Sequence, residues 1–220
     1  MTQMVAKRLL TLLAAGMLIN VTPRTLPTPS SDSPAVMRLF DAAADAFAAK
    51  GFHATTTRDI ASRAGLSPAG VYVHFASKED LLFQLSRDGH VGARDAMAAA
   101  AGDADSPTEA LRQMIGRFAR WHAEELTLAR IVQYEFRHLT DEHRHEVLDL
   151  RREIDAVVRS VVEAGMTSGE FDVRDSHATT LALLSLVVDV ARWYHPGVRR
   201  TPDEIEETYG ALALRLVAAR

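Results

Sequence analysis

Apolar residues recur every three or four positions along most of this 220-residue chain, with charged residues between them. That period is typical of helices that bury one face and expose the other. Segment 142–166 is one example, with Val147, Leu150 and Ile154 on its apolar face. No run of alternating β-branched residues competes with this pattern, so we predict an all-α protein. Helices are expected near 34–50, in two short pieces between 55 and 76, from 77 to about 101, and over 107–125, 127–139, 142–166, 181–191 and 203–219.

Four helix starts are marked by a serine or threonine directly before a proline. The hydroxyl can accept a bond from an unpaired backbone N–H, and proline is tolerated at the first helical position. Glu109 and Glu204 stand three residues after two of these caps, as a capping box requires. Gly51, Gly65 and Gly102 stand where three helices should stop. The four starts are Ser33-Pro34, Ser67-Pro68, Ser106-Pro107 and Thr201-Pro202.

Residues 55–82 contain two short helices joined by a tight turn and followed at once by a third. Thr56 or Thr57 can cap the first helix, and Gly65 supplies the left-handed turn that ends it. Ser67 then caps the second helix. This arrangement is a helix-turn-helix, whose second helix enters a DNA major groove.

The same segment resembles the TetR family of bacterial transcriptional regulators, over about residues 35–85. The resemblance implies a DNA-binding domain over 33–80, followed by an effector-binding and dimerisation domain over 81–220. It also implies that the helix starting after Ser77 connects the two. The matching motifs are Thr57-Arg58-Asp59-Ile60-Ala61, Ala64-Gly65, Tyr72-x-His74-Phe75 and Ser77-Lys78-Glu79-Asp80-Leu81-Leu82.

The resemblance and the chemistry of the side chains together indicate which residues contact double-stranded operator DNA. Thr57 and Arg58 stand at a helix N-terminus, whose unpaired N–H groups favour a phosphate. Tyr72 can donate its hydroxyl to a phosphate or lay its ring on a thymine methyl group. TetR-like proteins place a phosphate clamp at the position of Lys78, while His74 can touch phosphate or satisfy a bond within the small domain. The full candidate set is Thr56, Thr57, Arg58, Ser67, Ala69, Gly70, Tyr72, His74 and Lys78.

The predicted recognition helix opens with the small residues Ser67, Ala69 and Gly70. They allow close approach but offer few hydrogen bonds to bases, so we expect backbone contacts and DNA shape to supply much of the specificity. Val71 and Phe75 are interpreted as core. The small residues also keep a second interpretation open, namely a small-molecule-binding or scaffolding protein whose DNA-binding head is weak or vestigial.

The formal net charge is −4, so affinity for DNA must come from local cations rather than from the overall field. Cysteine is absent, which excludes disulfides and thiolate metal sites. This composition favours a cytoplasmic regulator. The cations around the helix-turn-helix are Arg38, Lys50, Arg58, Arg63 and Lys78.

Residues 1–32 need a separate interpretation. Lys7 and Arg8 precede about a dozen apolar residues, a pattern typical of a secretory signal and too short for a transmembrane helix of ~20 residues. Export would not suit a DNA-binding protein. We therefore interpret 1–32 as a poorly ordered extension or a mis-assigned start, with a DNA-contacting arm as the next alternative.

The second domain is where a regulator of this kind holds a small-molecule effector. Helices 107–125 and 127–139 carry aromatic residues among aliphatic ones, and a space among bundle helices is a natural ligand site. Most of these residues are also what a plain core would contain. Gly89 and Gly92 in the preceding helix form either a joint between the domains or a break in the helix. The candidate effector contacts are Phe118, Trp121, Arg130, Tyr134, Arg192 and Trp193.

The last two helices predict a homodimer. Residues 181–191 are apolar nearly all round, and 203–219 add Ile205, Tyr209 and Leu212 at helical spacing. A helix that is apolar on every side must be buried on every side. TetR-like proteins dimerise through their last two long helices, which is consistent with this pattern. Filling the core of a single chain is the alternative.

Arg192-Trp193-Tyr194-x-Pro196-Gly197 is the most distinctive motif of the second half. It resembles a subgroup of TetR regulators that includes actinobacterial repressors of cholesterol-ring and fatty-acid catabolism, whose members respond to acyl-CoA thioesters. Arg192 could meet a phosphate or carboxylate while Trp193 and Tyr194 offer flat apolar faces. Alternatively, the aromatic pair staples the dimer interface and Pro196-Gly197 turns the chain.

A His/Glu-rich zone over 135–146 raises the question of a metal site. It contains no His-Glu-x-x-His motif and no Glu-x-x-His pair repeated on separate helices. We also find no nucleophile motif and no Gly-rich phosphate loop. The sequence therefore predicts a ligand-responsive transcriptional regulator, a repressor released from operator DNA by a small hydrophobic effector. We expect no enzyme activity, no metal, no cofactor and no membrane partner.

Overall fold

The computed structural model describes residues 33–195 and 197–219, and the predicted extension over 1–32 lies outside them. The described residues form helices and connecting turns without a strand, which confirms the predicted all-α fold. The helices are α2 (Pro34–Ala54), α3 (Thr57–Ala64), α4 (Pro68–Tyr72), α5 (Lys78–Asp103), α6 (Pro107–Glu124), α7 (Leu126–Tyr134), the 3₁₀ turn η1 (Phe136–His138), α8 (Asp141–Ser168), α9 (Ser176–Val188), α10 (Val190–Trp193) and α11 (Pro202–Leu216).

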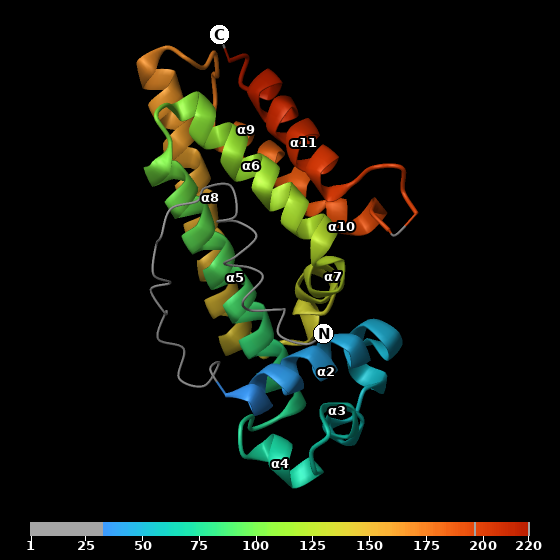
Figure 1. Cartoon of the computed structure of the whole chain (residues 1–220). Helices are drawn as coiled ribbons and strands as arrows, with labels where there is room; N and C mark the ends of the chain where they lie inside the picture. Colours follow the sequence, from blue (N-terminus) through green and yellow to red (C-terminus); the bar gives the residue numbers. More distant parts are fainter. Residues whose placement is uncertain (1–32, 196, 220) are drawn as a thin grey trace.

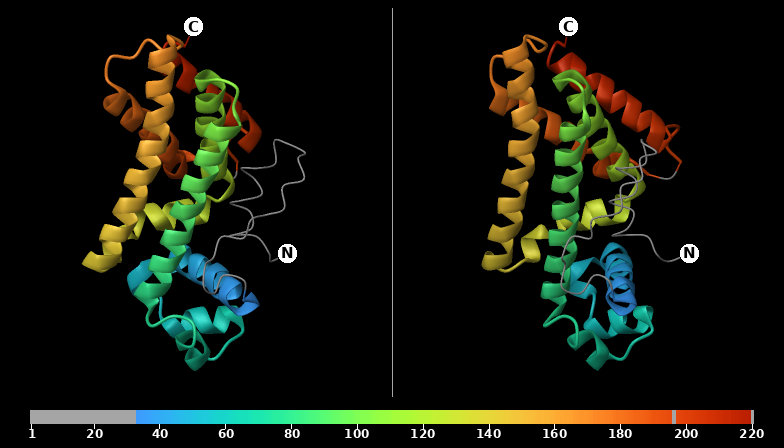
Figure 2. Two further views of the ribbon diagram at one scale, coloured as in Figure 1. Left: turned by 90° about the vertical axis from the view of Figure 1, so that its left-hand side faces the viewer. Right: turned by 60° about the vertical axis from the view of Figure 1, so that its left-hand side comes forward.

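Helices α2, α3 and α4 form a small head at one end of the molecule, and α6, α9 and α11 lie toward the other end (Figure 1). The long helices α5 and α8 run side by side and connect these two regions (Figure 2). Helix α7 lies between the head and the upper helices (Figure 1). The predicted domain boundary at residues 80–81 falls inside α5, so one continuous helix belongs to both regions.

The predicted caps explain where several of these helices begin. Ser67 and Ser106 each accept a bond from the backbone N–H three residues later, and Thr201 forms a full capping box with Glu204. The second predicted capping box is wrong. The Glu109 carboxylate accepts bonds from Arg112 instead of bonding back to the cap. Ser33 also makes no side-chain cap bond.

The glycines behave differently from one another. Gly65 takes a left-handed conformation (φ 68°) and ends α3 as predicted, and Gly51 (φ 76°) breaks the helical geometry near the end of α2. Gly102 lies within the last turn of α5, one residue before its end. Gly89 and Gly92 do not break the helix, because α5 runs through both positions and buries them.

Helices α6 and α11 approach each other closely because a glycine stands on each at the contact. A Cβ added at Gly116 would lie 2.7 Å from the Glu206 carbonyl oxygen, and one added at Gly210 would lie 3.0 Å from the Arg112 carbonyl oxygen. Both distances are shorter than ordinary carbon–oxygen contacts. The crossing therefore depends on the missing side chains at these two positions.

Helices α9 and α11 bury one side and expose apolar residues on the other. Leu183, Val187 and Ile205 are fully buried in the core of the chain. This accounts for part of the apolar character that predicted a dimer, as the alternative interpretation proposed. Four leucines still face outward, namely Leu181, Leu186, Leu212 and Leu216. Within residues 33–195 and 197–219, none of the helices has the length and hydropathy to cross a membrane.

Candidate DNA-binding face and ligand cavity

The helix-turn-helix is built from local hydrogen bonds that its sequence encodes. Thr56 caps α3 in a reciprocal box: its Oγ1 accepts from the Asp59 N–H at 3.1 Å, and its own N–H donates to Asp59 Oδ2 at 2.9 Å. These bonds to Thr56, with a further one from Lys50, lower the pKa of Asp59 to about 2. Ser67 Oγ accepts from the Gly70 N–H at 3.1 Å and starts α4.

Most of the predicted DNA contacts lie on the outer surface of this head, at the end of the molecule that Figure 1 shows furthest from α9 and α11. Tyr72 is 57% exposed, and its hydroxyl lies 3.4 Å from Thr57 Oγ1, which links α4 to the start of α3. Val71 and Phe75 are buried, which confirms their interpretation as core. Exposed candidates are Thr56, Arg58, Ser67, Ala69 and Tyr72, and half-buried ones are Thr57, Gly70, His74 and Lys78.

The cations of the head divide into two groups. Arg38 Nε donates to the Ala64 carbonyl at the C-terminus of α3, and Lys50 pairs with Asp59 at 3.3 Å. Both therefore brace the head. Arg58 and Arg63 are exposed on α3 and are available to a phosphate.

Lys78 has a structural role that the sequence did not predict. Its Nζ donates to the carbonyl oxygens of Phe52 at 2.6 Å and Thr55 at 2.7 Å, and lies 4.2 Å from the Phe52 ring centroid. Partial burial lowers the pKa of the ammonium. Lys78 thus holds the end of α2 against the start of α5, and its contact with a phosphate stays a prediction.

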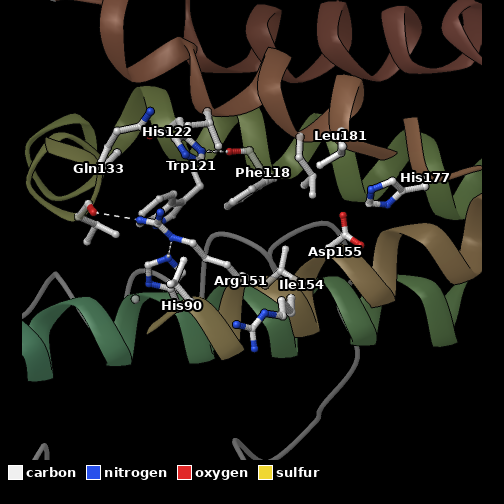
Figure 3. A pocket seen from close by; sticks show the side chains of 17 residues that line it. His90, Phe118, Trp121, His122, Gln133, Arg151, Ile154, Asp155, His177 and Leu181 are labelled. Carbon is white, nitrogen blue, oxygen red and sulfur yellow. Dashed lines mark hydrogen bonds between the residues drawn. The ribbon is translucent and has the colours of Figure 1, made fainter. Parts of the chain in front are cut away.

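A cavity of about 530 Å³ lies among α5, α6, α7, α8 and α9. Its volume falls in the range that small-molecule sites occupy, roughly 300–1,000 Å³. Figure 3 shows His90, His122 and Gln133 toward one end and His177 and Asp155 toward the other. The lining residues are mostly apolar, and they include Phe118, Trp121, Val132, Ile154, Leu181, Leu184 and Val188.

The buried histidines of the cavity are neutral. His90 Nδ1 donates to the Ser86 carbonyl at 2.7 Å, and His122 Nδ1 donates to the Phe118 carbonyl at 2.8 Å. Burial lowers the pKa of both rings to about 4. Because Nδ1 carries the proton, each Nε2 is left as an acceptor.

Of the six predicted effector contacts, only Phe118 and Trp121 line this cavity, with ring centroids 6.2 Å apart. Arg130 Nε and Nη2 donate to the carbonyls of Ala191 and Tyr194 and hold the end of α10. Arg192 is exposed and forms a two-bond pair with Asp189, at 2.6 and 2.8 Å. The remaining two, Tyr134 and Trp193, also lie outside the cavity lining.

Two family descriptions match the chain. Residues 39–85 match the bacterial regulatory proteins of the tetR family, and residues 104–217 match the tetracyclin repressor-like C-terminal domain. The chain belongs to the TetR family.

Individual relatives support this membership. The transcriptional repressor KstR2 of Rhodococcus jostii is 32% identical over 88% of this chain and 96% of its own length. A tetR-family regulatory protein from Rhodococcus RHA1 has a crystal structure with a TM-score of 0.79, 39% identity, and coverage of 86% of this chain and 99% of that chain. The regulator FadR of Bacillus subtilis in complex with stearoyl-CoA shares the fold, at a TM-score of 0.70 and 22% identity over 83% of this chain and 97% of that one.

The cavity of this TetR-family chain contains polar residues that sequence reasoning missed. Arg151 stands among charged neighbours on α8, so helical periodicity alone did not separate it from the solvated face. His90 lies next to Gly89, and both line the cavity from α5. Gly89 and Gly92 were the signal in the sequence that could have located His90, because two glycines among charged residues indicate a buried stretch of the helix.

The junction between the head and the rest of the chain is rich in histidine. His138 of η1 stacks on Phe52 with ring centroids 5.1 Å apart. His143 of α8 stacks on Phe83 at 3.8 Å and contacts the Glu79 carboxylate at 3.0 Å. Part of the predicted His/Glu-rich zone therefore packs η1 against the head and α8 against the start of α5.

Proposed function

We propose that this chain represses transcription by binding operator DNA as a homodimer, and that a hydrophobic acyl-CoA releases it. The observation that carries the proposal is the position of the cavity: α5 and α7 line it, and both helices contact the DNA-binding head. A ligand that changes the position of either helix also changes the position of the recognition helix.

On the DNA side, α4 enters the major groove with Tyr72 and the small residues Ala69 and Gly70 at its surface. Arg58 and Arg63 supply the phosphate contacts that the internally bonded Arg38 and Lys50 do not. Thr56, Thr57, Ser67, His74 and Lys78 complete the contact set. Two heads of a dimer then bind half-sites one DNA turn apart, ~34–36 Å.

The dimer forms through α9 and α11. Leu186 on α9, and Leu212 and Leu216 on α11, are exposed in the single chain and lie outside the cavity lining. Large apolar side chains exposed on the two helices are consistent with an interface. The partner covers the leucines that the monomer core leaves outside.

The effector places its acyl group in the cavity, where Phe118, Trp121 and the leucines of α9 supply apolar surface. The resemblance of the C-terminal motif to acyl-CoA-responsive regulators supports a thioester as the ligand. The stearoyl-CoA complex of B. subtilis FadR shows that the same fold can hold such a molecule.

Selection from random DNA, followed by titration of the protein–operator complex, tests the proposal. We expect a palindromic operator, release by long-chain or polycyclic CoA thioesters, and little release by free CoA or the free acids. Failure to select any sequence would favour the alternative of a vestigial head. Release by free acids or hydrophobic drugs but not by thioesters would refute the acyl-CoA effector while leaving the repressor intact.

A further inference from the structure

The cavity contains a half-buried cation, Arg151, without a carboxylate partner among the described residues. Arg151 Nε donates to the neutral His90 Nε2 at 3.1 Å, and its Nη2 donates to the Val132 carbonyl at 3.3 Å. Its guanidinium lies 4.4 Å from the Phe136 ring centroid. Asp155, one turn away on α8, lies 3.7 Å from Arg159 instead. The charge of Arg151 is therefore held by neutral groups only.

A second donor lies in the same wall. Trp121 is only 5% exposed, and its Nε1–H has no hydrogen-bond partner in residues 33–195 and 197–219. A buried donor without an acceptor is unfavourable, because it has lost its hydrogen bonds to water. Trp121 and Arg151 both line the cavity, and Figure 3 shows them close to each other in that view, near the end that holds His90 and His122.

Two other polar residues that line the cavity are not buried. Arg152 is exposed and pairs with Asp149, and His177 is exposed at the start of α9. The end of the cavity toward His177 is therefore open to solvent, and a large polar group of a ligand can stay in contact with water there. The end near Arg151 holds the buried side chains of His90, His122 and Trp121, while Gln133 at this end is exposed.

We propose that Arg151 and Trp121 are specificity-determining residues, which select an effector whose buried part carries an sp² oxygen, either a ketone or a carboxylate. This inference rests on the proposed function. An oxygen acceptor placed there would accept bonds from both donors. A plain hydrocarbon tail would fill the same space but leave the indole N–H without an acceptor and the guanidinium with only its neutral partners His90 and Val132.

The test uses CoA thioesters of one chain length, titrated calorimetrically into the full-length protein. The probes are decanoyl-CoA, its 5-, 7- and 9-oxo derivatives, and the ω-carboxyl analogue 9-carboxynonanoyl-CoA. A hydrogen bond from a charged donor should make at least one oxygenated thioester bind about tenfold or more tightly than decanoyl-CoA. If an oxo derivative shows the largest increase in affinity, the recognised group is a ketone; if the ω-carboxyl analogue does, it is a carboxylate.

Variants separate recognition from structure. Arg151→Met should reduce the ratio of affinities for the oxygenated and plain thioesters to near one, and Trp121→Phe should reduce it by a few-fold. Arg152→Met, one position along α8, is the matched control and should leave the ratio unchanged. Trp121→Phe keeps the test valid if Arg151→Met fails to fold, as circular dichroism would show.

The outcomes distinguish the two proposals. If neither these probes nor the long-chain and polycyclic CoA thioesters of the release assay bind, the acyl-CoA function is wrong. If the thioesters bind but oxygen brings no gain, or if the gain survives in Arg151→Met and Trp121→Phe, the selection by Arg151 and Trp121 is wrong.

Discussion

The close crossing of α6 and α11 gives a prediction whose sign depends only on the tertiary structure. Replacing glycine by alanine inside a helix normally stabilises it by about 1 kcal/mol. At Gly116 the new Cβ would lie 2.7 Å from the Glu206 carbonyl oxygen and 3.2 Å from Glu206 Cγ. The carbonyl belongs to the backbone of α11, so the two helices must separate by several tenths of an ångström.

Overpacking of this kind typically costs ~1–3 kcal/mol. For Gly116→Ala this cost offsets the helix-propensity gain of about 1 kcal/mol and exceeds it, so we expect the free energy of unfolding to fall by up to about 2 kcal/mol. Gly102→Ala is the matched control, because Gly102 lies in the last turn of α5 and a Cβ there meets nothing within 4 Å. We expect this control to raise the free energy of unfolding by up to ~1 kcal/mol.

Urea unfolding followed by far-UV circular dichroism measures both changes, at one protein concentration because dimer stability depends on it. Gly210→Ala, on the opposite side of the same crossing, should resemble Gly116→Ala. The reasoning is refuted if Gly116→Ala and Gly102→Ala both stabilise the protein, because the crossing would then have room for a methyl group.

Four further changes test the head, the interface and the cavity. Lys78→Met removes two bonds to backbone carbonyls, so it should lower the free energy of unfolding by roughly 1–3 kcal/mol in urea titrations, in addition to weakening DNA binding at all sequences. Tyr72→Ala should weaken operator binding in gel-shift assays more than Tyr72→Phe does, with little effect on stability because the side chain is exposed. Leu212→Glu should give a monomer in analytical ultracentrifugation, since it places a charge on the apolar face of α11. The free energy of unfolding should fall as the pH is lowered from about 6.5 to about 4. In this range the histidines of the unfolded chain take up protons, while His90 and His122 stay neutral in the folded chain down to a pH of about 4. Each of the two contributes on the order of 3 kcal/mol to the loss.

Each of these has a control and a contrary result. Val73→Glu, at the exposed residue that follows α4, should stay dimeric, and a dimer in both glutamate variants would argue against the α9–α11 interface. Glutamine does not titrate, so His122→Gln should lose less free energy of unfolding than the parent protein as the pH is lowered. An equal loss in the two proteins would show that groups other than His122 cause it. A Lys78→Met protein as stable as its parent would show that the two carbonyl bonds contribute nothing measurable, and equal operator affinity for both Tyr72 variants would remove the ring from the contact set.

Much of the fold was predictable because its signals are local. A serine or threonine cap acts on an N–H three residues away, and the apolar period of a helix needs only its own neighbours in sequence. Thr56, Ser67 and Thr201 therefore mark real helix starts, and Gly65 marks a real end. The helix-turn-helix and the family resemblance follow from the same short segment.

The roles of the charged residues could not be predicted in this way. Sequence shows that Arg38, Lys50, Arg58, Arg63 and Lys78 surround the helix-turn-helix, but not which of them find partners. Only the packing of α2 against α3 and α5 brings carbonyls and Asp59 to three of these cations, and leaves Arg58 and Arg63 exposed.

The cavity depended on tertiary structure even more strongly. Arg192 and Arg151 are both arginines on helices beside apolar residues, and nothing in their local sequence separates an exposed ion pair from a half-buried cation held by neutral groups. The difference comes from the rotation of α8 about its axis as it packs on α5, which brings Arg151 to His90 across 61 positions of sequence. Local pattern determines that a helix forms and which stripe is apolar. The direction in which its borderline polar residues point is decided by partners that are distant in the chain, because only they determine which side is excluded from water.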